Sequence, residues 1–268
     1  MNNVAIFSVP RSGSTWLGQL FNSHPNVMYK FQPNFAYSFE PELREDSSPK
    51  EINAFFNELI NSEDDFVNGR ISISSKKNMV FDKDLPSHLV FKETHYLNVI
   101  ENLLLNSNTK VIGLVRSPFA VINSWLKIPK EFDPNWDVKT QWRTGDNKNQ
   151  GRPSHFFGYN KWKEATELFL SLKKERPRQF YLAEYEKMVA NPLKSIGEIF
   201  EFCGLDVSNQ TQQFLKLASE KNDEDPYAVL KTKKDDLQWR KTLPQFITNG
   251  ILEDTDFVYL NKIFGWLA

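Results

Sequence analysis

The sequence has little of several features that would point to particular classes of protein. Its 268 residues include one cysteine, Cys203, which excludes an internal disulfide framework and is typical of a reducing compartment. No apolar run approaches the length that spans a bilayer, and the first expected strand begins at Val4, which leaves no room for a signal peptide. We therefore expect a cytoplasmic protein without a membrane partner.

The charges are evenly distributed along the chain, and no linker separates it into domains. Lys and Arg total 33 and Asp and Glu total 34, which gives a net charge of −1, and the lysines are scattered among acidic residues. A nucleic-acid surface needs a dominant basic face, so we expect no nucleic-acid partner. No segment rich in proline, glycine and serine interrupts the sequence, so we expect residues 1–268 to form one domain.

The chain is organised around a short apolar run followed by a polar turn. Residues 4–9 are nearly all apolar, as in a strand buried on both faces of a parallel sheet, and Leu17, Leu20 and Phe21 then recur at helical spacing. The turn between them supplies a cation, hydroxyl groups and the amides of a helix start, which together suit an anion. These candidate anion-binding residues are Arg11, Ser12, Gly13, Ser14 and Thr15. An ordinary strand, turn and helix is the alternative interpretation.

Two further apolar runs also end in functional side chains. The first leads to Lys92 and His95, and the second, residues 109–115, leads to Arg116. In open α/β sheets, ligands gather at the carboxyl ends of parallel strands. We therefore expect the strand ends that carry these residues to converge with the one that carries Arg11.

A helix is expected directly after Arg116. Ser117 is a favoured N-cap residue, and Pro118 is favoured at the first helical position. Ser124 follows Ser117 by seven residues, almost two helical turns, so both lie on nearly the same face. This spacing predicts that Arg116 and Ser124 bind one phosphate together.

These motifs resemble those of the sulfotransferases that use 3′-phosphoadenosine 5′-phosphosulfate (PAPS). Residues 10–17 are similar to the family's 5′-phosphosulfate loop, and Arg116 with Ser124 reproduces the spacing of its 3′-phosphate site. The resemblance implies an α/β fold of the P-loop NTPase-like sulfotransferase type, with PAPS as co-substrate. It also implies that Arg11 contacts the 5′-phosphosulfate.

Two later segments resemble the same family. Residues 179–192 are similar to its strand and "YEDL…NP" turn, where Tyr185 matches a tyrosine that contacts adenine. Residues 230–240 resemble the C-terminal lid whose basic residues reach the 3′-phosphate, and Lys233 is the candidate there. Trp16, just inside the first helix, could offer adenine a stacking surface or could pack in the core.

The loop lacks the lysine of a Walker A motif, which agrees with the resemblance. Walker A reads G-x-x-x-x-G-K-[ST], whereas here Ser14 follows Gly13 and the cation, Arg11, precedes it. A transferring sulfuryl group carries less negative charge than a phosphoryl group, so an arginine, helix-end amides and hydroxyls can suffice. We therefore expect no metal ion.

A base must take the proton of the acceptor hydroxyl. His95 is the candidate, because an unperturbed histidine pKa of about 6.5 suits proton transfer near neutral pH. The family's cytosolic branch carries Lys-Thr-His at the corresponding strand end, which implies that Lys92 stabilises the bridging oxygen. Glu93 is inserted here and is the alternative base.

Gln32 stands where carbohydrate sulfotransferases often have a glutamate. A glutamine cannot act as a base, but Gln32 could bind an acceptor hydroxyl.

The combined expectation is a single α/β domain with a central parallel sheet flanked by helices. We expect it to transfer a sulfuryl group from PAPS to a hydroxyl of a carbohydrate or small-molecule acceptor. A nucleotide or small-molecule kinase of P-loop type is one alternative, and it would need ATP and Mg²⁺. A catalytically silent nucleotide-binding protein is the other, and it would bind 3′-phosphoadenosine 5′-phosphate (PAP) without any transfer.

Overall fold

A five-stranded parallel sheet forms the centre of the computed structural model, which describes residues 1–36, 39–69, 80–220 and 236–267. The strand order is β2-β3-β1-β4-β5, and every neighbouring pair is parallel. The strands are β1 (Asn2–Phe7), β2 (Val27–Phe31), β3 (His88–Glu93), β4 (Lys110–Val115) and β5 (Phe180–Glu184). The sheet topology confirms the expected fold class.

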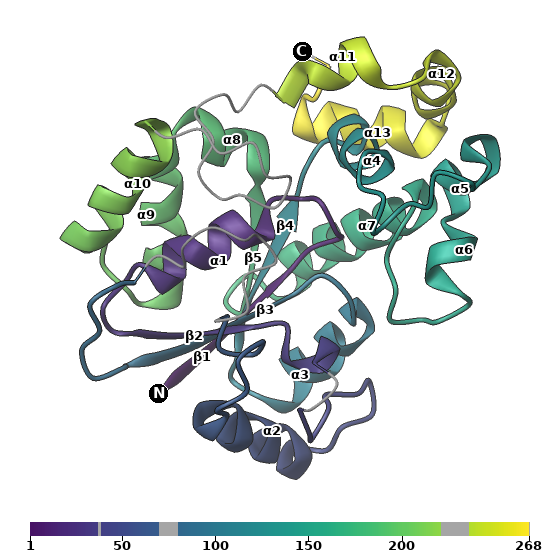
Figure 1. Cartoon of the computed structure of the whole chain (residues 1–268). Coiled ribbons are helices and arrows are strands. Elements are labelled where there is room, and N and C mark those ends of the chain that lie inside the picture. Colours follow the sequence, from purple (N-terminus) through teal and green to yellow (C-terminus); the bar gives the residue numbers. More distant parts are fainter. Residues whose placement is uncertain (37–38, 70–79, 221–235, 268) are drawn as a thin grey trace.

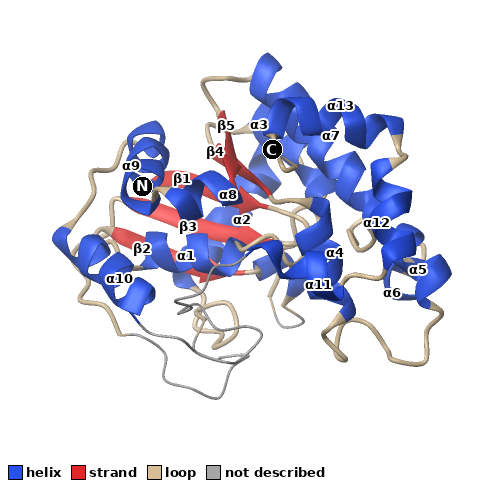
Figure 2. Cartoon of the chain, turned by 90° about the horizontal axis from the view of Figure 1, so that it is seen from above, coloured by secondary structure: helices blue, strands red, loops and turns tan. Residues whose placement is uncertain are grey.

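Helices connect the strands and cover both faces of the sheet (Figures 1 and 2). Those before β5 are α1 (Ser14–Asn22), α2 (Pro49–Asn61), α3 (Ile100–Asn106), α4 (Pro118–Leu126), α5 (Val138–Thr144), α6 (Asp146–Asn149) and α7 (Tyr159–Glu175). Those after it are α8 (Tyr185–Ala190), α9 (Pro192–Cys203), α10 (Asn209–Glu220), α11 (Trp239–Thr242), α12 (Gln245–Leu252) and α13 (Thr255–Phe264). Short 3₁₀ turns are η1 (Pro33–Phe35), η2 (Leu97–Val99) and η3 (Asp236–Gln238).

The two faces of the sheet belong to two hydrophobic cores. In β1, Val4 and Ile6 face the core formed with α1, α9 and α10, whereas Ala5 and Phe7 face the core formed with α2, α3 and α7. All four side chains are fully buried, which explains why the strand reads as a continuous apolar run. A sheet covered on both sides leaves the ends of its strands as the natural place for a ligand.

The C-terminal helices pack beside α4, at the end of the sheet where β4 terminates (Figure 1). The indole of Trp239 stacks on the ring of Phe119 from α4, with centroids 4.2 Å apart and planes 15° apart. Phe257 of α13 meets the same phenylalanine edge to face at 5.2 Å. These aromatic contacts fix α4, which carries one of the predicted anion-binding residues.

Most elements expected from the sequence are present. The strands expected from apolar runs are β1, β3 and β4, and the helix expected after Arg116 is α4. Residues 127–157 show little periodicity in sequence, yet they contain the short helices α5 and α6. No helix in the described ranges is both long and apolar enough to cross a membrane.

Candidate functional site

Three basic side chains gather at the carboxyl edge of the sheet. Arg11 follows β1, Lys92 is the penultimate residue of β3, and Arg116 follows β4. Because β1 lies between β3 and β4, these three strand ends are neighbours. The structure therefore brings together the strand ends that the sequence analysis expected to converge.

The turn between β1 and α1 allows other groups to approach the backbone closely. Gly13 precedes α1 with a φ of 93°, and Arg11 has a φ of 71°, so both residues adopt left-handed conformations. A Cβ atom on Gly13 would lie 2.4 Å from Cε2 of Tyr185, so a larger residue requires this ring to move. No side chain caps this helix start, and within the described residues the buried hydroxyl of Ser12 has no hydrogen-bond partner. This arrangement suits an anion held by helix-end amides and hydroxyls.

Direct contacts join the two predicted anion sites. Nε of Arg11 donates a hydrogen bond to Oγ of Ser124 at 3.1 Å, and Nη1 of Arg116 donates to the carbonyl oxygen of Arg11 at 2.8 Å. The guanidinium carbon of Arg116 lies 4.4 Å from the ring centroid of Tyr185, which is a cation–π contact. Nε1 of Trp162 donates to the carbonyl oxygen of Arg116 at 3.0 Å and anchors its backbone. Residues predicted for the 5′ and 3′ ends of the donor thus form one cluster.

Trp16 and Tyr185 belong to the same cluster. Their rings meet edge to face with centroids 6.3 Å apart, and Trp16 is 6% exposed in the core beneath α1. Trp16 therefore packs in the core, which was one of its two expected roles. A contact of either ring with adenine stays a prediction. Lys233, the basic residue predicted to reach the 3′-phosphate, lies outside the described residues.

Ser117 occupies the expected N-cap position of α4, but its side chain does not cap the helix. Its amide donates instead to Oε1 of Glu186 at 2.8 Å, so a carboxylate from α8 lies at this helix start. The hydroxyl of Ser117 is buried, with no hydrogen-bond partner among the described residues. The helix start is therefore confirmed, and the cap expected from the serine side chain is not formed.

Lys92 is buried on the same face of the sheet as α1. In the strand register it pairs with Ile6 and Phe31, which both belong to that core. Its Nζ lies 4.5 Å from the ring centroid of Phe31 and 3.5 Å from Oε1 of Gln32. The pKa of Lys92 is lowered to about 8, chiefly by burial; the charge of Glu93 opposes this shift, that of Arg11 adds to it, and that of Glu131 opposes it. An ammonium group with few ligands of its own is well suited to stabilise a developing anion.

His95 lies just beyond β3 in an aromatic enclosure. Its ring stacks on Phe35 with centroids 5.0 Å apart and meets the rings of His155 and Phe157 edge to face. Burial, assisted by the charges of His155 and Lys92, lowers the pKa of His95 to about 3. The imidazole is therefore neutral at neutral pH, the state that a general base requires, although such a low pKa makes it a weak base.

Glu93, the alternative base, lies on the opposite face of β3 from Lys92. It pairs in register with Phe7, and its Oε1 accepts a hydrogen bond from the amide of Asn34 at 2.8 Å. Burial raises the pKa of Glu93 to about 8, although the Asn34 amide and Lys92 oppose this shift. Glu93 is thus a largely protonated acid at neutral pH and holds the start of η1.

Gln32 connects the strand ends of β2 and β3. Its side-chain Oε1 accepts a hydrogen bond from Oγ1 of Thr94 at 2.6 Å, and its backbone N–H donates to the carbonyl oxygen of Lys92 at 2.9 Å. Gln32 has a φ of 42°, an uncommon left-handed conformation for a residue other than glycine. Its side-chain amide lies beside Lys92, with Oε1 3.5 Å from Nζ, and the binding of an acceptor hydroxyl by Gln32 stays a prediction.

Glu131 is a site residue that sequence reasoning missed. Its Oε1 lies 3.5 Å from Nη1 of Arg11, and the two side chains are 18% and 13% exposed. Glu131 follows α4 in a segment without apolar periodicity, and a glutamate in such a segment reads as ordinary surface charge. No motif or spacing in the sequence indicated a contact with Arg11.

The groups in the cluster are of the kinds that bind the anionic ends of the donor. The cluster offers two arginines from different strand ends, the crowded glycine turn, and the buried hydroxyls of Ser12 and Ser117. Groups of this kind bind phosphate and sulfate oxygens. Within the described residues, no group of three or more His, Cys, Asp or Glu side chains could hold a metal ion.

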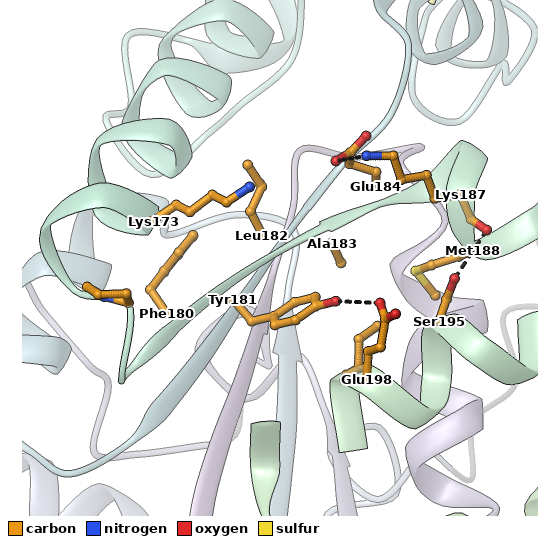
Figure 3. Close-up of a pocket in the computed structure, with 12 residues that line it drawn as sticks. Lys173, Phe180, Tyr181, Leu182, Ala183, Glu184, Lys187, Met188, Ser195 and Glu198 are labelled. Carbon is orange, nitrogen blue, oxygen red and sulfur yellow. Dashed lines mark hydrogen bonds and ion pairs between the residues drawn. The ribbon is translucent and has the colours of Figure 1, made fainter. Parts of the chain in front are cut away.

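A separate groove of about 410 Å³ lies along β5, at one edge of the sheet (Figure 3). Its polar groups bond to one another: the Tyr181 hydroxyl donates to Glu198 at 3.4 Å, and Lys187 pairs with Glu184 at 2.7 Å. Ser195 donates to the carbonyl of Lys187 at 3.1 Å. None of the predicted site residues is among the described residues that line it, so this groove is not the candidate site.

The parallel sheet places Arg11, Lys92 and Arg116 at neighbouring strand ends, where open α/β sheets bind their ligands. A family model described as the sulfotransferase domain matches residues 2–255, so the chain belongs to the sulfotransferase family. It is an enzyme of that family, with PAPS as co-substrate. No curated protein matches the chain.

Solved structures share this fold. A mouse sulfotransferase, SULT7A1, complexed with PAP, is 13% identical with a TM-score of 0.52, and the match covers 98% of this chain and 89% of that one. Retinol dehydratase in a complex with retinol and PAP is 15% identical with a TM-score of 0.52. That match covers 92% of this chain and 78% of the other. At these identities the likeness describes the fold.

Proposed function

We propose that the chain transfers the sulfuryl group of PAPS to a hydroxyl of a small molecule or saccharide. The observation that carries this proposal is the contact between Arg11 and Ser124, reinforced by the hydrogen bond from Arg116 to the Arg11 carbonyl. These contacts make one cradle from two motifs. A donor with a 5′-phosphosulfate and a separate 3′-phosphate needs such a double site.

In this proposal the two ends of the donor have different ligands. Arg116 and Ser124 bind the 3′-phosphate. The turn after β1 holds the 5′ end through the residues Arg11, Ser12, Gly13, Ser14 and Thr15. Tyr185 contacts both the 5′ and the 3′ binding residues, because its ring lies against Gly13 and beneath the Arg116 guanidinium. We also retain Lys233 as the proposed C-terminal ligand of the 3′-phosphate.

The acceptor side is formed by the end of β3 and the residues after it. The acceptor oxygen forms a bond to sulfur, the bond from sulfur to the bridging oxygen breaks, and the acceptor proton passes to His95 or, alternatively, to Glu93. Lys92 stabilises the negative charge that develops on the bridging oxygen. Phe35 is 39% exposed while stacked on His95, which favours an acceptor with an apolar portion beside its hydroxyl.

The single cysteine does not take part in this chemistry. Cys203 is buried at the end of α9, and burial raises the pKa of its thiol to about 12. A thiol with that pKa holds its proton and is a poor nucleophile. A cytoplasmic location stays a prediction, supported by the absence of a second cysteine from the sequence.

The test is transfer of label from [³⁵S]PAPS to a panel of phenols, aliphatic alcohols and saccharides, in buffer that contains EDTA. The proposal expects a labelled product with at least one acceptor and stoichiometric release of PAP. Phosphate transfer from ATP that depends on Mg²⁺ would instead identify a kinase. Binding of PAP with no transfer to any acceptor class would identify a silent nucleotide-binding protein.

A further inference from the structure

The guanidinium of Arg11 is shared between two groups that follow one another along the chain. Its Nε donates to Ser124 in α4, and its Nη1 lies 3.5 Å from the carboxylate of Glu131 in the turn after α4. The proposed function requires the same guanidinium to meet the anionic 5′ end of the donor. An internal carboxylate and a ligand anion therefore compete for one cation.

The backbone of Glu131 is held in place from both sides. Its amide donates to the carbonyl of Ile128 at 2.8 Å, and its carbonyl accepts a hydrogen bond from Nε1 of Trp125 at 3.1 Å. The neighbouring Phe132 is buried and packs edge to face on the Trp125 ring, with centroids 5.1 Å apart. The carboxylate is therefore presented to Arg11 by a turn whose backbone is fixed.

Arg11 is equally constrained at its backbone. It has a φ of 71°, and its carbonyl oxygen accepts the hydrogen bond from Arg116. A change of partner must therefore occur by rotation of the side chain. Both side chains keep some exposure to solvent, 13% for Arg11 and 18% for Glu131.

The charge of Glu131 also reaches Lys92. Among the described residues, two charges act on the ammonium of Lys92 from beyond its own strand: Arg11 lowers its pKa, and Glu131 raises it. Arg11, Lys92 and Glu131 thus form one electrostatic group. A dianionic ligand placed among them is attracted by two cations and repelled by one carboxylate.

We propose that Glu131 is a positioning residue, an internal counter-ion that holds the Arg11 guanidinium until the 5′ anion of the donor replaces it. The inference rests on the proposed function in one respect, because it takes Arg11 as the ligand of that anion. Glu131 acts through Arg11, so removal of its charge strengthens nucleotide binding. A merely structural residue has the opposite effect when it is changed.

The experiment is calorimetric titration of PAP into the full chain and its variants, with adenosine 3′-phosphate, which lacks the 5′ anion, as a second ligand. Glu131→Gln keeps the shape of the side chain and removes the charge, and we expect PAP to bind about three- to tenfold more tightly. Adenosine 3′-phosphate should gain less than twofold. Asp133→Asn removes the same charge two residues further along, and it should leave both affinities unchanged.

A double variant tests whether the effect of Glu131 on PAP affinity depends on Arg11. In an Arg11→Ala background, Glu131→Gln should give no gain in PAP affinity, because the competition has lost its cation. Glu131→Asp keeps the charge and should bind PAP within about twofold of the wild type. Unfolding temperatures of each variant, measured without ligand, establish that the comparison concerns folded protein.

Three results would overturn the inference. These are weaker or unchanged binding of PAP by Glu131→Gln, an equal gain for adenosine 3′-phosphate, and a gain that persists in the Arg11→Ala background. If the wild type binds PAP and one of these results is found, only the role of Glu131 fails. If the wild type does not bind PAP, the proposed function fails as well.

Discussion

Nε of Arg11 donates a hydrogen bond to Oγ of Ser124 at 3.1 Å, although 113 positions separate the two residues in the chain. Arg11 belongs to the turn after β1, and Ser124 lies at the end of the second turn of α4. The bond makes one polar cluster from motifs that are separate in sequence. The two predicted anion-binding motifs are therefore neighbours in the folded chain.

Replacement of Arg11 by alanine should impair turnover more than nucleotide binding. Negative charge develops on the bridging oxygen as its bond to sulfur breaks, and a fixed cation there favours the transition state over the ground state. We expect Arg11→Ala to lower kcat at least ten times more than it weakens binding of PAP. Kinetics and calorimetry on the same preparation measure the two effects, and Arg178→Ala, at an exposed position, is the control. A loss confined to binding would make Arg11 only a donor ligand.

Gly13→Ala should abolish nucleotide binding and destabilise the protein. Its φ of 93° is unfavourable for alanine, and the new Cβ would lie 2.4 Å from Cε2 of Tyr185. The clash displaces the ring that supports the Arg116 guanidinium. We expect a loss on the order of 1–3 kcal/mol in the free energy of unfolding, measured with urea.

Gly151→Ala separates strain from crowding. Gly151 also has a positive φ, 68°, but no atom lies within 4 Å of the position of an added Cβ. This variant should lose some stability and retain wild-type affinity for PAP. If Gly13→Ala also retained that affinity, the close approach of Tyr185 to the turn would have no part in donor binding.

His95→Ala should retain donor binding and lose roughly 10²–10⁴ of the rate, which is the usual contribution of a general base. The base must be neutral to accept a proton, and burial lowers the pKa of His95 to about 3. The histidine therefore stays in its active state as the pH falls, until about pH 3. The wild-type rate should show no acidic limb from His95 between pH 5 and 8. A limb near pH 6.5 that vanishes in His95→Ala would show that the ring is hydrated during turnover.

Glu93→Gln distinguishes the alternative base and also tests its burial. If His95 is the base, this variant stays active, because a glutamine oxygen can accept the same hydrogen bond from Asn34. Burial raises the pKa of Glu93 to about 8, so the native carboxyl holds its proton where the unfolded one releases it. The stability that this carboxyl contributes is full below its unfolded pKa and is lost as the pH rises through 8.

Urea titrations between pH 5 and 8.5 measure this effect. The free energy of unfolding of the wild type should fall relative to that of Glu93→Gln across the range. Parallel curves for the two proteins would mean that Glu93 ionises with an ordinary pKa. A loss of activity in Glu93→Gln, with His95→Ala still active, would assign the base to the carboxylate.

The sequence was sufficient to predict which strand ends carry the candidate residues, because buried parallel strands read as apolar runs and their carboxyl ends share one edge. It located Arg11, Lys92 and Arg116 at such ends. These ends are neighbours because β1 lies between β3 and β4. That strand order follows from tertiary packing and cannot be read from the sequence. The strand register was also needed to place Lys92 and Glu93 on opposite faces.

The finer features of the site depend on contacts between distant segments. Ser117 has the residue type of a helix cap, yet Glu186 from α8 accepts the hydrogen bond of its amide. The depressed pKa of His95 results from burial among rings that come from two distant segments, at Phe35 and at residues 155–157. Glu131 belongs to no motif, so only the fold reveals its contact with Arg11.

The most direct test of the account is the affinity of the wild type and of Arg116→Ala for PAP and for AMP, measured by calorimetry in EDTA. Arg116 is held by the Arg11 carbonyl and the Tyr185 ring, and a lost charge-assisted contact costs about 1.5–3 kcal/mol, or roughly 10- to 150-fold. We expect the wild type to prefer PAP by at least that factor and Arg116→Ala to lose most of the preference. Equal affinity of the wild type for PAP and AMP would contradict the assignment of a separate 3′-phosphate site.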